Sequence, residues 1–92
     1  MAEPLDYSVL AEARVGPTDM SRLLKVSRVT ASLWVNGHTT PSPLVNARVR
    51  EFLDAVGKAY DAGELPVPFG VSRRERGMYL TRTLERHRAQ VA

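Results

Sequence analysis

Residues 18–41 have the sequence TDMSRLLKVSRVTASLWVNGHTTP, which predicts two short helices joined by a tight turn. Thr18 is a suitable N-cap for the first helix, because its hydroxyl can accept a hydrogen bond from a backbone N–H of the first turn. Ser27 is a second N-cap and opens a helix over Arg28–Asn36. Gly37 follows where a left-handed C-cap is favoured. These signals fix the centre of the expected fold.

The second of these helices is expected to present one side to its surroundings. The side that we expect to face inward comprises Val26, Thr30, Ala31 and Trp34. The outer side of its first turns comprises Arg28, Val29, Ser32 and Leu33. An exposed first turn that carries an arginine, a serine and apolar groups suits the edges of bases in a DNA groove.

The string LLKVSRVTASLWVNGHTTP resembles the helix-turn-helix of the lambda-repressor/Cro (XRE-type) family. It is similar to that family's leucine–glycine–valine–serine turn and its tryptophan-x-asparagine-glycine ending, over Pro17 to about Pro43. Two positions depart from the pattern. Ser21 stands where the family usually has alanine, and Lys25 stands where it usually has glycine, so Lys25 must adopt the backbone angles of the turn without glycine's freedom.

The resemblance implies a DNA-binding regulator of the kind seen in phage and mobile-element repressors, working as a homodimer on double-stranded DNA. In that reading Arg28 would contact guanine or a phosphate, Val29 and Leu33 would touch thymine methyl groups, and Ser32 would reach a base or a phosphate. Leu33 would equally suit a protein interface. The candidate contacts to the DNA backbone are Arg22, Lys25, Ser27, Thr30, Asn36, His38 and Thr39.

Helical periodicity extends on both sides of this motif. A first helix is expected over residues 6–14, ended by Gly16-Pro17, and a long helix over residues 43–62, capped by Ser42 and ended by Gly63. Gly57 inside the long helix is a candidate for a close approach of another element. The apolar stripe of the long helix is Leu44, Val45, Val49, Phe52, Leu53, Val56, Ala59 and Tyr60.

The C-terminal third begins with the connector ELPVPFGV, residues 64–71, whose two prolines exclude a helix. Its alternating Leu65, Val67, Phe69 and Val71 allow a short strand, although a packed linker is favoured. Ser72 and Glu75 form a capping box that starts a last helix, running toward His87 or beyond. Leu80, Leu84, His87 and Val91 share one face of it.

The fold class is therefore all-α, a compact domain of about five helices with a C-terminal helical extension. We expect a helix-turn-helix domain over residues 1–63, the connector over 64–71 and an arginine-rich helix over 72–92. The connector and the last helix could pack on their own domain or cross to a partner as a dimerisation arm. The last helix could also contact phosphates or be a partly disordered tail.

Charge is concentrated in blocks along the chain. Residues 21–50 carry five basic and no acidic side chains, and residues 71–92 carry six arginines against two glutamates. The segments 1–20 and 51–70 each have a net charge of −3. Eleven of the 13 basic residues are arginine, which forms bidentate contacts with phosphate and guanine better than lysine does. The basic blocks fall on the helix-turn-helix and on the last helix.

Several classes of function find no support in the sequence. The chain has no cysteine, two histidines and no HExxH, GxSxG or phosphate-binding glycine loop, so we expect neither an enzyme nor a metal or cofactor site. No run of 18 apolar residues and no secretory signal is seen, so a cytoplasmic protein is expected, in a bacterial nucleoid or a phage-infected host. The expected function is a sequence-specific DNA-binding regulator of transcription, acting as a repressor, that reads the major groove with the helix over residues 28–36; the alternative is a protein-interaction module on the same fold, such as an antitoxin or an antagonist of another regulator.

Overall fold

A computed structural model describes residues 5–68 and 70–89 of the chain. Over these ranges the protein forms helices and no strand. The helices are α1 (Ser8–Ala13), α2 (Pro17–Leu24), α3 (Arg28–Val35), α4 (Pro43–Asp61) and α5 (Arg73–Ala89). The expectation of an all-α fold with five helices is confirmed. Phe69 and Val91, which entered the expectations above, lie outside the described residues.

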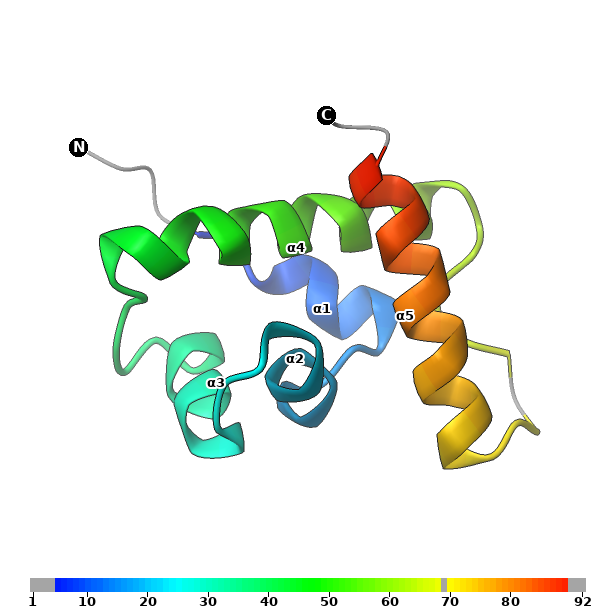
Figure 1. Ribbon diagram of the computed structural model, residues 1–92, viewed down its shortest axis with the longest axis horizontal. Coiled ribbons are helices and arrows are strands. Elements are labelled where there is room, and N and C mark those ends of the chain that lie inside the picture. Colours follow the sequence, from blue (N-terminus) through cyan, green and yellow to red (C-terminus); the bar gives the residue numbers. More distant parts are fainter. Residues whose placement is uncertain (1–4, 69, 90–92) are drawn as a thin grey trace.

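The helices surround one apolar core (Figure 1). The long helix α4 lies along the top of the view, α1 lies beneath it, α2 and α3 lie lower still, and α5 runs down the right-hand side. Contacts between elements are concentrated in the pairs α2–α3, α4–α5 and α1–α4. The largest fully buried side chains are Met20, Val49, Val56 and Leu80, which come from α2, α4 and α5. The core therefore joins the helix-turn-helix region to the last helix.

The start of α2 differs from the expectation. Gly16, not Thr18, is the N-cap, and Pro17 occupies the first helical position. The backbone N–H of Gly16 donates to Oδ2 of Asp19 at 3.2 Å, which closes the first turn. The prediction of a Thr18 cap was wrong because proline fits the first helical position, where no N–H is needed, and so moves the cap one residue before it.

The turn between α2 and α3 follows the expectation. Lys25 has a φ of 58°, the left-handed conformation that glycine would adopt more easily. Ser27 caps α3, since its Oγ accepts a hydrogen bond from the backbone N–H of Thr30 at 3.0 Å. Gly37 has a φ of 77° just beyond the end of α3. The chain thus makes two short helices joined by a turn at residues 25–27.

Two helices depart from their expected bounds or faces. α1 is shorter than residues 6–14 and ends before Arg14, which takes a left-handed φ of 56°. In α4 the apolar stripe does not extend to its ends: Leu44 is 90% exposed and Tyr60 is 37% exposed. In Figure 1 the first turn of α4, which includes Leu44, projects beyond the start of α1. Gly57 marks no close approach, because a Cβ there would lie 4.0 Å from the nearest side-chain atom, Cγ2 of Val9.

The connector and α5 pack against their own chain. Leu65, Leu80 and Leu84 all belong to the core cluster, and His87 is buried beside them. The connector is a packed linker rather than a strand in the part that the structure describes. The leucine face that was considered for a dimer contact is therefore covered within the molecule. Among the described helices, none has the length and apolar character required to span a lipid bilayer.

Candidate nucleic-acid interface

The outer side of α3 forms an exposed surface beside the start of α2. Arg28 is exposed, Val29 is 70% exposed and Leu33 is 36% exposed. Together with the partly exposed Ser32, these side chains line a shallow hollow whose other wall is Pro17 and Thr18. The structure thus brings together all the residues predicted to contact bases.

The opposite side of α3 holds the helix in place. Ala31 is fully buried and Trp34 is 6% exposed, and both belong to the core cluster. Residues three or four positions apart lie on one side of a helix, so this spacing separates a packed side from a presented side. The expected inward orientation of Ala31 and Trp34 is confirmed, whereas Val26 and Thr30 are only partly buried.

The N-cap of α3 engages two of the predicted backbone contacts. The Ser27 hydroxyl donates to Oγ1 of Thr30 at 2.7 Å while it accepts from the Thr30 N–H. These contacts position the first turn of α3. The Ser27 proton is therefore used within the cap, and the Thr30 hydroxyl lies directly beside it.

Three other predicted contacts lie at the far end of α3. Nδ2 of Asn36 donates to Oγ of Ser32 at 3.2 Å. The backbone N–H groups of His38 and Thr39 donate to the Leu33 carbonyl at 2.9 and 3.4 Å, and both side chains are exposed. At 1.5 Å per residue, Asn36 is about 12 Å along the helix axis from Arg28. These groups could therefore contact a polymer only if it extends along the whole length of α3.

A basic hollow adjoins the first turn of α3. It has a volume of about 460 Å³ and is lined by the arginines Arg22, Arg28, Arg73 and Arg76, with Gly16, Thr18 and Asp19. The one acid in its lining is Asp19, which is paired with Arg76 at 2.5 Å. Arg28 and Thr18 also line the hollow on the outer side of α3. The two hollows therefore form one continuous surface.

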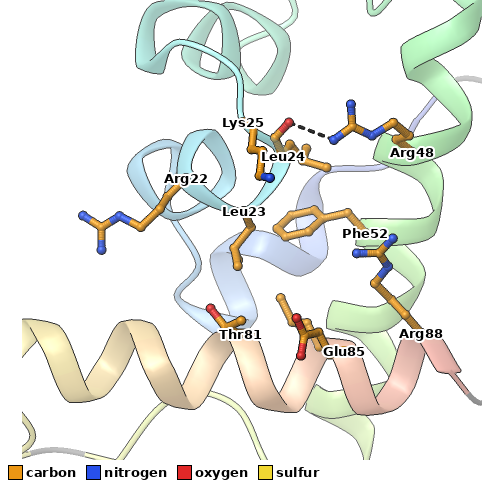
Figure 2. A pocket seen from close by; sticks show the side chains of 10 residues that line it. Arg22, Leu23, Leu24, Lys25, Arg48, Phe52, Thr81, Glu85 and Arg88 are labelled. Atoms are coloured by element: carbon orange, nitrogen blue, oxygen red, sulfur yellow. Dashed lines mark hydrogen bonds between the residues drawn. The ribbon is translucent and has the colours of Figure 1, made fainter.

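Lys25 lies elsewhere, over a groove between α2, α4 and α5 (Figure 2). Leu23, Phe52 and Leu84 supply apolar lining to this groove, and the guanidinium of Arg48, which also lines it, donates to the Leu24 carbonyl at 3.0 Å. Its volume of about 230 Å³ is below the range of about 300–1,000 Å³ typical of small-molecule sites. We interpret the groove as a gap between packed helices rather than a ligand site. Lys25 lines this groove and neither of the hollows beside the first turn of α3.

Thr18 and Arg73 are among the residues of this surface that were not assigned to it from the sequence. Thr18 was interpreted as a helix cap. The signal that could have assigned it to this surface is its position in the first turn of α2, which lies beside the start of α3. Arg73 was placed in the C-terminal helix, for which contact with phosphates was one of several open alternatives, and no local pattern could reveal that α5 begins next to α2. Its position follows from the packing of helices far apart in the sequence.

Across residues 5–68 and 70–89, no three side chains of the histidine, aspartate and glutamate kind are grouped so as to hold a metal ion. In comparisons with protein families, curated proteins and solved structures, nothing was found to match this chain.

Proposed function

We propose that this protein is a sequence-specific regulator of transcription, acting as a repressor, that reads the major groove of double-stranded DNA with α3. One observation carries the proposal: α3 buries Ala31 and Trp34 while it holds Arg28, Val29, Ser32 and Leu33 on an exposed surface beside the start of α2. An α-helix fits the major groove, and the N-terminal residues of a recognition helix are those that meet base edges.

The chemistry of the exposed side chains fits this role. The Arg28 guanidinium can donate two hydrogen bonds to O6 and N7 of guanine, and Val29 offers an apolar surface for a thymine methyl group. Neither side chain is needed to fill the core, since both are exposed. The neighbouring Arg22 adds positive charge at the edge of this surface, where a phosphate would lie.

The proposal predicts a defined binding site and a specific role for Arg28. We expect selection from a random duplex library to yield one preferred sequence. Arg28→Ala should then weaken binding to that sequence by about 1–3 kcal/mol and relax the preference at one base pair. Arg82→Ala removes the same charge from an exposed position on α5 and serves as the control. Unchanged binding and unchanged preference in Arg28→Ala would disprove the role assigned to Arg28, and selection that yields no preferred sequence would disprove the proposed function.

We further propose that two copies bind together, because one recognition helix reads only a few base pairs. The selected site should then be nearly palindromic, with half-sites about 34 Å apart, one turn of DNA. The leucines of α5 cannot form the contact between copies, since Leu80 and Leu84 are buried in their own core. A single half-site bound by one chain would contradict this part of the proposal.

A second candidate function has one observation in its favour. Val29 and Leu33 give the outer side of α3 an apolar character that would also suit the groove of a protein partner. The two functions differ in their dependence on salt. Binding through several phosphates weakens steeply as salt rises, because counterions are released from DNA, whereas apolar association does not weaken in this way.

A further inference from the structure

The first turn of α5 carries arginines that lie beside the helix-turn-helix, although 36 residues of chain separate α3 from Ser72. Arg73 and Arg76 line the same basic hollow as Arg22 and Arg28. Figure 1 shows the same arrangement of elements: α3 and the beginning of α5 flank α2 along the lower side of the molecule. Arg73 and Arg76 of the C-terminal basic block therefore lie beside Arg22 and Arg28 of the helix-turn-helix block in space.

Arg76 fixes the start of α5 in this place. Its Nη1 is 2.5 Å from Oδ1 of Asp19 in α2, and its Nη2 donates to the Arg14 carbonyl at 2.7 Å. The Arg22 side chain reaches the same turn of α5, since a Cβ on Gly77 would lie 3.4 Å from its Nη1, an ordinary contact distance. The beginning of α5 is thus held against α2, and the position of Arg73 relative to α3 is set before any ligand binds.

The other three arginines of the hollow keep their charge uncompensated. Arg22, Arg28 and Arg73 are exposed, and none of them forms an ion pair with a described residue. Asp19 is the acid in the lining, and it is already paired with Arg76. Three exposed guanidinium groups around one hollow repel one another, so an anion placed between them would relieve that repulsion.

We infer that Arg73 and Arg22 form a phosphate-binding site that extends the DNA contact from α3 onto α5. This inference rests on the proposed function, because it places the bound anion on the backbone of the duplex that α3 reads. Guanidinium groups bind phosphate oxygens in bidentate fashion. The hollow is continuous with the surface of α3 through Arg28 and Thr18, so a backbone that passes the start of α3 passes Arg22 and Arg73 as well.

Such a site adds affinity and fixes the orientation of the protein on DNA, but it does not read sequence. It assigns a role to the C-terminal helix: α5 supplies a second backbone contact on the side of α2 remote from α3. The duplex site covered by one chain is then longer than the part read by α3.

The test measures how binding depends on salt. Each phosphate neutralised contributes about 0.9 to the slope of log K against log salt on duplex DNA. We expect Arg73→Ala to lower this slope by about 0.9 on a labelled random-sequence duplex of about 30 base pairs, roughly three helical turns, and on the selected site alike. Arg73→Lys should keep most of the slope. Arg73 is exposed and forms no ion pair with the described residues, so the thermal melt should not change.

The matched control is Arg82→Ala on the same helix. Arg82 is exposed and lies nine residues from Arg73, which is two and a half helical turns and so the opposite side of α5. An unchanged slope in Arg82→Ala, with a lowered slope in Arg73→Ala, supports the site. Equal slopes in the two variants, whether both lowered or both unchanged, overturn the phosphate site. They leave the proposed sequence-specific binding through Arg28 untouched. A wild-type protein that binds no duplex overturns both the site and the proposed function.

Discussion

Leu33 and Trp34 are neighbours in α3, yet they have opposite roles in the structure. Trp34 is 6% exposed and packs in the core, whereas Leu33 lines the hollow on the outer side of the helix. A step of one residue turns the side chain by about 100° around the helix axis, because there are about 3.6 residues per turn. The identity of each residue matters for a different property: Trp34 for stability and Leu33 for binding.

This division predicts opposite effects of two alanine substitutions. Trp34→Ala should lower the free energy of unfolding by about 3–5 kcal/mol, because it removes a large buried side chain and leaves a cavity. Leu33→Ala should change it by less than about 1 kcal/mol, since a partly exposed side chain loses little packing. Urea titration followed by circular dichroism measures both. If Trp34→Ala left the unfolding midpoint near that of the wild type and abolished binding, Trp34 would be a contact residue instead.

At the scale of the helix, Gly57 inside α4 and Gly63 just beyond its end differ in whether the backbone requires a glycine there. Gly57 lies inside α4, and a Cβ there would make only an ordinary contact with Val9 at 4.0 Å. Gly63 follows the helix with a φ of 78°, a conformation that side chains with a Cβ adopt at a cost. The first glycine weakens its helix without a packing reason, whereas the second is needed by its turn.

Substitution of glycine by alanine should therefore change the stability of the protein in opposite directions at the two positions. Gly57→Ala should stabilise the protein by about 0.5–1 kcal/mol, because alanine is the better helix former and restricts the unfolded chain. Gly63→Ala should destabilise it by about 1 kcal/mol or more. For a domain of this size, about 1 kcal/mol corresponds to a shift of about 4–8 °C in Tm, which a thermal melt resolves. A lower Tm in Gly57→Ala would mean that α4 and α1 pack more closely there than the structure has them.

The helices themselves could be predicted from local sequence because local physics sets them. The Ser27 cap, the left-handed Lys25 and the final Gly37 depend only on residues within a turn of each other. The misplaced Thr18 cap was also a local matter, in which the preference of proline for the first helical position prevailed. The exposure of Leu44, by contrast, depends on which elements pack around the start of α4, which no periodicity within α4 encodes.

At the scale of the whole molecule, long-range contacts set the parts that the sequence could not predict. Arg76 in α5 binds Asp19 in α2, and Arg88 in α5 donates to Glu51 in α4 at 3.0 Å. Glu64 at the start of the connector also binds α5. Its carboxylate is paired with Arg86 and His87, and its backbone carbonyl accepts a hydrogen bond from the Tyr79 hydroxyl at 2.7 Å. Pairs so far apart leave no repeating pattern along the chain, so the place of α5 beside α2 emerges only in the folded structure.

The last helix should accordingly be required for folding. Removal of residues 72–92 takes away Leu80 and Leu84, each worth about 1.5–3 kcal/mol when buried, and uncovers the core residues beneath them. Domains of this kind are stable by only about 5–15 kcal/mol, so we expect the fragment 1–71 to lose its cooperative thermal transition. Two point variants in the full chain separate packing from chain length: Leu80→Ala should cost about 2–5 kcal/mol, whereas Met78→Ala, at a site 47% exposed, should cost less than about 1 kcal/mol. A fragment 1–71 that melts cooperatively, together with a Leu80→Ala variant as stable as Met78→Ala, would show instead that α5 is an accessory arm on an independent domain.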